Sequence, residues 1–223
     1  MTPDALLTNL DDLIASAPEE IPATPEEIAA AAEESRIKIR DAKAWQAVGG
    51  RTGWPVKYLA AVKTPPHGEE WLKAYEAAKE RVLMNGIVVL YGKRGGGKTR
   101  MAAELAVMIG SSRYRTAMRF FLEVRATFRK DSEKSEMDVI DELAKADLLI
   151  LDEIQERGET AFEDRLLTHV IDARYAAMKP TVLIANLAKS DLAESLGKSI
   201  VDRARENGKS IEFNWPSYRE MKP

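Results

Sequence analysis

Two well-separated segments carry the residue types of a nucleotide-hydrolysing site. The first, residues 92–99, reads GKRGGGKT and fits the pattern G-x-x-x-x-G-K-[ST] of a phosphate-binding loop. In such a loop the glycines let backbone N–H groups curl around the phosphates, the lysine reaches the β- and γ-phosphates, and the hydroxyl binds Mg²⁺. The predicted nucleotide contacts are Gly92, Lys93, Arg94, Gly95, Gly96, Gly97, Lys98, Thr99 and Arg100, with Thr99 also a metal ligand.

The second segment is an apolar run at residues 148–151 that ends in Asp152 and Glu153. A run without polar alternation is typical of a strand buried on both faces of a parallel sheet. At its end Asp152 is predicted to hold Mg²⁺, directly or through water, and Glu153 to orient and deprotonate the attacking water. Taken alone, the first segment could be a glycine-rich turn that fits the pattern by chance, and the second could end in two solvated acids. Together the two segments favour hydrolysis of a nucleoside triphosphate, with ATP and Mg²⁺ as the expected ligands.

The elements that position these residues alternate along the chain. Strands are expected at 87–91, 116–121, 148–152, 181–185 and 210–213. Helices are expected at 38–47, 69–84, 101–106, 123–130, 137–145 and 161–178, the last ending before Pro180. Strands that alternate with helices predict an α/β fold in which a central parallel sheet is flanked by helices on both faces.

This sheet also places two further candidates. Asn186 follows the strand at 181–185, so its side chain is expected at the same sheet edge as Asp152, where it can position the hydrolytic water. A turn-forming asparagine is the simpler alternative. Arg203, on a short helix that also carries Arg205, is a candidate arginine finger acting on a neighbouring subunit's nucleotide. The alternative is an ordinary surface arginine.

Composition limits the class of protein. A chain of 223 residues, 45% hydrophobic and 31% charged, has room for one substantial core and a small appendage. It has no cysteine and two histidines, which excludes disulfides, thiolate metal sites and a histidine zinc cage. No apolar stretch approaches the roughly twenty residues of a membrane span, and the acidic start is unlike a secretory signal. The sequence therefore predicts a cytoplasmic protein without a membrane partner.

The charge is unevenly distributed. Nine of the 36 acidic residues lie in residues 1–34, which hold no Lys or Arg, so the remainder carries 33 basic and 27 acidic residues. We expect a helical N-terminal arm at residues 1–47, a linker and helix at 48–84, and an ATPase core at 85–223. The arm has an apolar stripe of leucines that either folds back onto the body or binds a partner.

The chain resembles the DnaC/IstB-like branch of AAA+ ATPases, which includes bacterial and phage replicative helicase loaders. The resemblance covers roughly residues 50–220 and rests on the segments 92–99, 148–154, 171–186, 196–203 and 213–219. The last, FNWPSYR, is similar to the DnaC type rather than to the IstB transposition type. The arm matches no well-known N-terminal domain of the family, and it lacks the cysteines of the zinc site that some members have.

The resemblance implies a P-loop AAA+ core without a C-terminal lid domain, in which Asn186 is the sensor and Arg203 the arginine finger. It also implies three kinds of association. These are a replicative hexameric DNA helicase bound through the arm at residues 1–47, single-stranded DNA, and self-association through the ATPase interface.

Residues 113–130 are the candidate DNA contact. They hold six basic residues against one acid, Glu123, with Phe128 among them. Basic groups can follow a single strand's backbone while a ring stacks on a base. The candidates are Arg125, Phe128, Arg129 and, where the resemblance places a second aromatic, Phe162. The alternative for each phenylalanine is a place in the core.

We therefore expect an ATP-dependent, Mg²⁺-dependent loader of the replicative DNA helicase. The alternatives are an IstB-like transposition ATPase, a small-molecule phosphotransferase, and a non-hydrolysing adaptor in which Glu153 is idle. Turnover stimulated by single-stranded DNA separates the first two functions from the last two.

Overall fold

The computed structural model describes residues 53–54, 68–158 and 160–218. The arm predicted at residues 1–47, with its helices and leucine stripe, lies outside these ranges, as does most of the linker before residue 68. The boundaries predicted for these two parts of the chain stay predictions.

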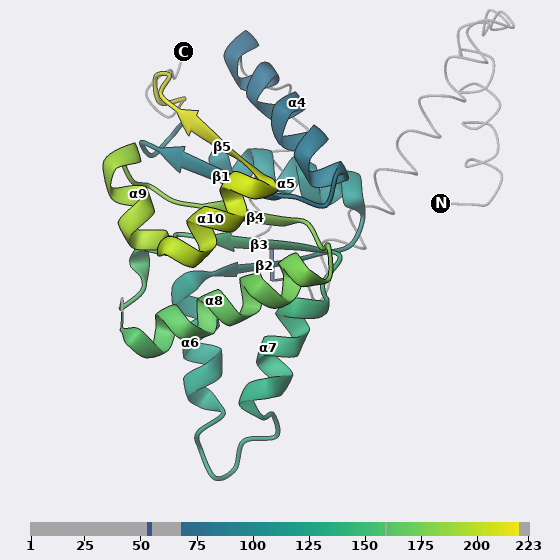
Figure 1. The fold of residues 1–223 in the computed structure, drawn as a ribbon, viewed down its shortest axis with the longest axis vertical. Helices are drawn as coiled ribbons and strands as arrows, with labels where there is room; N and C mark the ends of the chain where they lie inside the picture. The colour runs from purple at the N-terminus through teal and green to yellow at the C-terminus, as the bar shows by residue number, and fades with distance from the viewer. Residues whose placement is uncertain (1–52, 55–67, 159, 219–223) are drawn as a thin grey trace, which may run out of the picture. The chain divides into compact units, whose positions relative to one another are not determined.

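The described residues form five strands and seven α-helices. The strands are β1 (Ile87–Gly92), β2 (Ser112–Thr116), β3 (Leu148–Asp152), β4 (Thr181–Ile184) and β5 (Gly208–Phe213). The α-helices are α4 (Glu69–Leu83), α5 (Lys98–Ile109), α6 (Ala117–Ala126), α7 (Glu136–Lys145), α8 (Ala161–Ala176), α9 (Lys189–Leu196) and α10 (Lys198–Glu206), and a 3-10 helix, η1, spans Ile154–Glu156. All strand pairs are parallel, in the order β2-β3-β4-β1-β5 (Figure 1).

Both faces of the sheet are buried, which explains why the central strands are continuous apolar runs. In β1, Val88 and Leu90 belong to the core under α4 and α5. Ile87 and Val89 belong to the second core, under α6 to α10. The predicted α/β fold, a parallel sheet covered by helices on both faces, is confirmed.

The strand register brings the predicted functional segments to one edge of the sheet. Leu90 of β1 pairs with Ile184 of β4, and Leu151 of β3 pairs with Leu183 of β4. On the other side of β1, Gly92 pairs with Phe213 of β5. Because the strands are parallel, the segments that follow β1, β3, β4 and β5 all leave the sheet at this edge.

The prediction of a strand at 116–121 is wrong, because β2 ends at Thr116 and α6 starts at the next residue. The Thr116 hydroxyl caps α6 by accepting a hydrogen bond of 3.2 Å from the backbone N–H of Arg119. Ala117, Phe120 and Val124 are buried along α6 at helical spacing. The short apolar run that resembled a strand is therefore one face of a helix, and the helix expected at 123–130 ends at Ala126.

Arg174 joins α8 to the end of α7 and to the start of β4. Its side chain is fully buried, and its guanidinium donates to the backbone oxygens of Leu143, Ala144, Ala146 and Pro180 and to the hydroxyl of Thr181. Burial lowers the Arg174 pKa to about 10, an effect that the charge of Asp147 partly offsets. The carbonyls at a helix end need such donors, and Arg174 supplies them to Leu143, Ala144 and Ala146, while the Lys145 carbonyl accepts from the Lys179 ammonium.

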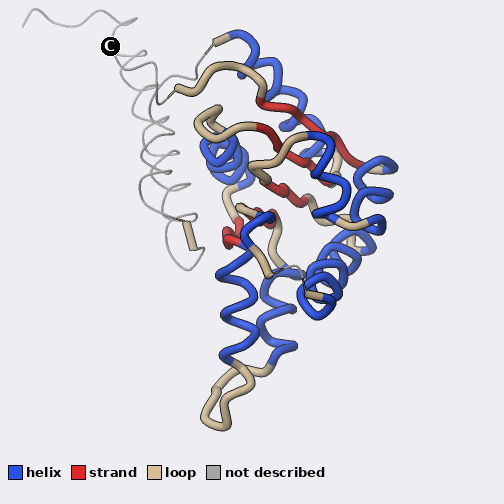
Figure 2. The backbone as a smooth tube through the Cα atoms, turned by 90° about the vertical axis from the view of Figure 1, so that its left-hand side faces the viewer, coloured by secondary structure: helices blue, strands red, loops and turns tan. Residues whose placement is uncertain are grey.

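Helices α6 and α7 form a hairpin that extends beyond the sheet, with its loop at the far end (Figure 2). A capping box starts α7: the Ser135 side chain accepts from the Asp138 N–H, and the Asp138 carboxylate accepts from the Ser135 N–H at 2.8 Å. The hairpin carries four of the six basic residues in the stretch predicted to contact DNA, and the other two, Arg113 and Arg115, lie on β2.

Candidate functional site

The phosphate-binding loop lies between β1 and α5, as the sequence pattern requires. Gly92, Gly95 and Gly97 have φ values of 116°, 89° and 89°, a region that side-chain-bearing residues rarely adopt. Lys98 starts α5 and is buried, and its ammonium donates to the carbonyl oxygens of Gly92 at 2.9 Å and Lys93 at 2.7 Å. The first turn of α5 follows directly on the loop and brings the positive end of the helix dipole to it, which suits an anion.

Thr99 and Asp152, predicted as the two metal ligands, lie in contact. The Thr99 hydroxyl donates to Asp152 Oδ2 at 2.8 Å, and the Tyr114 hydroxyl donates to the same oxygen at 2.9 Å. Burial raises the pKa of Asp152 above its ordinary value, while the hydrogen bonds from Thr99 and Tyr114 act in the opposite direction. Tyr114 was not predicted, because its role appears only when β2 is placed at 112–116 beside β3.

These donors fit Mg²⁺, which prefers oxygen ligands and is usually held by one or two carboxylates together with substrate phosphates. The described residues contain no cluster of three or more His, Cys, Asp or Glu side chains that could hold a metal without such help. A cation at Thr99 and Asp152 would therefore depend on the phosphates of a bound nucleotide, whose charge it would neutralise.

Glu153 follows Asp152 in a left-handed backbone conformation, with φ 55° and ψ 46°. Its N–H donates to Asp152 Oδ1 at 2.7 Å, which turns the chain sharply from β3 into η1. A residue other than glycine in this region costs roughly 1–3 kcal/mol, and such residues cluster at functional sites. Asn85 and Met178 have a similarly positive φ away from this site, so the role of Glu153 stays a prediction.

Asn186, the predicted sensor, is linked to the acidic end of β3 through Gln155. The backbone N–H of Asn186 donates to Gln155 Oε1 at 2.9 Å, so η1 and the end of β4 are held together. No pattern along the chain indicates Gln155, since the contact joins residues 31 positions apart. Asn186 and Glu153 therefore flank one short helix that restrains both.

Arg203 lies on α10, where it is engaged by its own subunit. Its guanidinium contacts Asp172 Oδ2 at 2.9 Å, donates to the carbonyl oxygen of Ser199 at 3.0 Å and lies 5.6 Å from the centre of the Tyr175 ring. In the described part of the chain, none of its recorded contacts is with the phosphate-binding loop. The structure thus keeps Arg203 away from the subunit's own loop, and its action on a neighbour stays a prediction.

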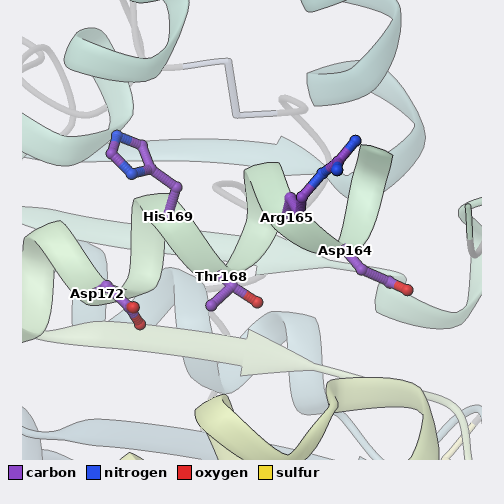
Figure 3. Close-up of a pocket in the computed structure, with 5 residues that line it drawn as sticks. All are labelled: Asp164, Arg165, Thr168, His169 and Asp172. Carbon is purple, nitrogen blue, oxygen red and sulfur yellow. The ribbon is translucent and has the colours of Figure 1, made fainter. Parts of the chain in front are cut away.

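A pocket lies along α8, which carries Asp172, the ion-pair partner of Arg203 (Figure 3). It is lined by Asp164, Arg165, Thr168, His169 and Asp172. None of these residues was predicted to contact nucleotide or metal. None of its lining residues belongs to the phosphate-binding loop. Two of them connect the pocket with the candidate site: Asp172 pairs with Arg203 at 2.9 Å, and Asp164 pairs at 3.0 Å with Arg157, which also donates to the carbonyl oxygen of Ile154 in η1.

Arg94 and Arg100, two other predicted nucleotide contacts, have partners within the protein. Arg100 is buried, pairs with Glu104 at 3.1 Å and lies 5.7 Å from the centre of the Trp71 ring. Arg94 pairs with Glu156 at 3.0 Å, and both side chains are largely exposed. Exposed pairs contribute little free energy and exchange easily, so Arg94 is the more available of the two for a nucleotide.

A family model described as IstB-like ATP binding protein matches residues 78–222. The chain belongs to this family. It is 32% identical over 136 residues to the replicative helicase loader DnaC of Escherichia coli strain K12. The aligned residues cover 59% of this chain and 55% of that protein. It is 28% identical over 198 residues to the replicative helicase loader DnaC of Buchnera aphidicola subsp. Acyrthosiphon pisum (strain APS), which covers 84% of this chain and 80% of that one.

A solved structure has the same fold as this IstB-like protein. The crystal structure of the DnaC helicase loader superposes with a TM-score of 0.60 at 17% identity, covering 72% of this chain and 100% of that one. The P-loop AAA+ fold and the predicted resemblance are confirmed. The chain spans only about half the length, 55%, of the E. coli relative that it matches. The family binds ATP, which supports the nucleotide predicted for residues 92–99.

In this IstB-like protein the residues predicted to contact DNA take part in two contacts within the protein itself. Arg125 of α6 pairs with Glu163 of α8 at 2.7 Å, where the arginine is 53% exposed and the glutamate 3%. Phe128 is 61% exposed, and its ring centre lies 6.1 Å from that of Phe162, which packs partly against the core. Arg129 is exposed beside them. The structure brings these residues together at one end of the α6–α7 hairpin, and their contact with DNA stays a prediction.

The described residues include no helix with the length and apolar character needed to cross a bilayer.

Proposed function

We propose that this IstB-like protein hydrolyses ATP with Mg²⁺ and uses the nucleotide state to load a replicative DNA helicase onto single-stranded DNA. The observation that carries the proposal is the contact between Thr99 and Asp152, which joins the phosphate-binding loop to the acidic end of β3. The likeness to relatives named as replicative helicase loaders supports the choice of helicase as the partner.

Each residue of the site has one task in this proposal. Backbone N–H groups of residues 95–98 and the Lys98 ammonium bind the phosphates, and Lys98 exchanges its present acceptors on Gly92 and Lys93 for phosphate oxygens. Thr99 and Asp152 hold the cation, whose contribution is to neutralise charge on the phosphates.

Glu153 accepts a proton from the attacking water, and Asn186 orients that water. Gln155 supports this pair because its side chain binds the Asn186 backbone. Arg203 stabilises negative charge on the phosphates of a neighbouring subunit's nucleotide, after it leaves Asp172. Self-association through the ATPase interface is thus part of the proposed mechanism.

Single-stranded DNA is proposed to bind along the α6–α7 hairpin. Phe128 is exposed enough to stack on a base, while Arg125 and Arg129 lie where they can contact phosphates. The acidic arm at residues 1–47, which lies outside the described residues, is the proposed helicase-binding region because its leucines and its charge distinguish it from the rest of the chain.

An IstB-like transposition ATPase is the second candidate function, favoured by the family model that matches the chain. It shares the ATP site and DNA binding but needs no helicase. The two functions therefore differ in one partner, not in the chemistry of the site.

The test is size-exclusion chromatography of the full chain, with ATP and Mg²⁺, together with the replicative helicase of its own host. We expect a complex with the full chain and none with a variant that lacks residues 1–47. A matched full-length variant, Lys98→Ala, keeps the arm but should lose the dependence of the complex on ATP. If the full chain binds no replicative helicase yet hydrolyses ATP in the presence of DNA, the transposition function replaces the loader function.

A further inference from the structure

The segment that follows β5 lies against the outer side of the phosphate-binding loop. We refer to residues 214–218 as the C-terminal strap. Because β5 pairs with β1 in parallel, with Gly92 opposite Phe213, the chain that leaves β5 emerges beside the loop that leaves β1. The strap is thus placed on the loop by the order of the strands.

Two hydrogen bonds join the strap to the loop. The indole N–H of Trp215 donates to the carbonyl oxygen of Gly96 at 3.0 Å, and the backbone N–H of Tyr218 donates to the carbonyl oxygen of Gly95 at 3.1 Å. The Trp215 ring also packs against Phe213 at a tilt of 44°, with ring centres 4.6 Å apart. Phe213 in turn lies 5.8 Å from the Lys98 ammonium.

These bonds fix the direction of two peptide groups. In a trans peptide the C=O and the following N–H point in opposite directions. The Gly96 carbonyl shares its peptide with the Gly97 N–H, and the Gly95 carbonyl shares its peptide with the Gly96 N–H. A strap that holds both carbonyls outward therefore turns both N–H groups toward the inner side of the loop, where phosphate oxygens would lie.

The strap also explains two of the three consecutive glycines. A side chain at Gly95 would collide with Ser217 of the strap. A side chain at Gly96 would come within 3.3 Å of Phe213, the last residue of β5, and within 3.5 Å of Trp215 of the strap. Glycine leaves these peptides free to rotate in the absence of a restraint, since it has no Cβ to limit φ and ψ. The strap therefore packs closely against the loop and restrains peptide groups that glycine would otherwise leave free to rotate.

We propose that Trp215 and the strap are positioning residues that hold the phosphate-binding loop in the shape that receives a nucleotide's phosphates. This inference rests on the proposed function, because it concerns the same nucleotide site. It assigns Trp215 a role in phosphate affinity rather than in the chemical step. The strap touches Gly95 and Gly96, whereas Glu153 and Asn186 follow other strands.

The test compares the full-length protein with Trp215→Phe, which keeps a ring against Phe213 and removes the indole donor. The dissociation constants of ADP and of inorganic pyrophosphate are measured by calorimetry, and the turnover number at saturating ATP is measured separately. We expect both dissociation constants to rise about 5- to 10-fold, the effect of losing one hydrogen bond, with turnover within about twofold of the original.

Trp54→Phe is the matched control. It also removes an indole donor, which binds the Ser112 hydroxyl at 3.0 Å, but Ser112 lies on β2, at the far edge of the sheet from β5. This variant should bind ADP and pyrophosphate like the original protein. Thermal unfolding of each variant shows whether it is folded, and Tyr218→Pro, which removes the second donor, serves if Trp215→Phe does not fold.

The outcomes separate this inference from the proposed function. Unchanged affinity for both ligands in a folded Trp215→Phe protein overturns the role of the strap and leaves the ATPase function intact. Loss of turnover with unchanged affinity also overturns it, since a positioning role in phosphate binding predicts the reverse. If the original protein binds neither ADP nor pyrophosphate, the proposed function itself fails.

Discussion

The Thr99 hydroxyl donates a hydrogen bond of 2.8 Å to the Asp152 carboxylate, and this contact joins the start of α5 to the end of β3. The two residues are far apart in the chain, and each was predicted as a ligand of the same cation. Their contact gives the site a paired hydroxyl and carboxylate beside the phosphate-binding loop. A substitution of either residue should therefore change mainly the Mg²⁺ concentration that ATP turnover requires.

The activity should depend on pH through Asp152. Burial raises its pKa above the ordinary value of 3.8, so the carboxyl takes up a proton at a higher pH than a solvated aspartate does. Below that raised pKa a proton competes with Mg²⁺, and above it the carboxylate is free to bind the metal. Magnesium titrations of ATP turnover at decreasing pH should give a rising half-saturating concentration, while ADP affinity in EDTA stays constant. A half-saturating concentration independent of pH would contradict this account.

Tyr114→Phe should make this pH dependence more pronounced. The Tyr114 hydroxyl donates to Asp152 Oδ2 at 2.9 Å and stabilises the ionised form. Without it the Asp152 pKa rises further, so Mg²⁺ binding should weaken at a higher pH than in the original protein. The same titrations measure the effect. If the profile of Tyr114→Phe matches the original, Tyr114 has only a packing role.

Arg174→Met should destabilise the fold without entering the site. It leaves buried carbonyls at the end of α7 and before β4 without their donor, and each unsatisfied group costs roughly 1–3 kcal/mol, so a loss of about 3 kcal/mol or more is expected. Urea unfolding measures the change. Arg165→Met on the same helix is the control, because Arg165 is exposed and its loss should cost little. Equal stabilities of the two variants would refute the role of Arg174.

Glu163→Gln should strengthen binding to single-stranded DNA. The buried carboxylate holds Arg125 at 2.7 Å, so DNA phosphates must compete with it for the guanidinium. A neutral amide competes less, and affinity at low salt should rise about 2- to 5-fold with a steeper dependence on salt. Fluorescence anisotropy with a labelled oligonucleotide measures both. Glu76→Gln, which makes the same change of net charge on α4, should have no such effect. A loss of affinity in Glu163→Gln would show that the ion pair positions Arg125 for DNA instead.

A mixing experiment tests the arginine finger. Arg203→Ala removes the finger but keeps Glu153. Glu153→Gln keeps Arg203 but removes the carboxylate, so each variant alone should be inactive. If Arg203 acts on a neighbour's nucleotide, mixed assemblies contain sites with both residues, and turnover should return to a substantial fraction of the original. The measurement is ATP turnover across mixing ratios. Mixtures that stay as inactive as their components would place Arg203 outside the neighbour's site.

The sequence predicted the parts of the site that depend on local patterns. A strand, a glycine-rich loop and a helix follow one another at residues 87–109, and an apolar run ends in acids at 148–153, so these segments could be recognised without knowing their neighbours. The parallel sheet then implied that Asn186 shares an edge with Asp152, which the strand order supports.

Contacts between distant segments could not be predicted in this way. Tyr114 reaches Asp152 across 38 positions and Trp215 reaches Gly96 across 119, and no periodicity along the chain indicates either contact. The strand predicted at 116–121 was wrong for a different reason. Phe120 and Phe121 suit a strand by type, but the Thr116 cap and the burial of Val124 make the segment a helix.

The most direct test of the central claim is ATP turnover, with and without single-stranded DNA, by the original protein and by Glu153→Gln. We predict that the original hydrolyses ATP faster when DNA is present, whereas Glu153→Gln binds ATP equally well and turns it over at least about 100-fold more slowly. Turnover by Glu153→Gln at the original rate, or no hydrolysis by the original protein, would contradict the assignment of this site.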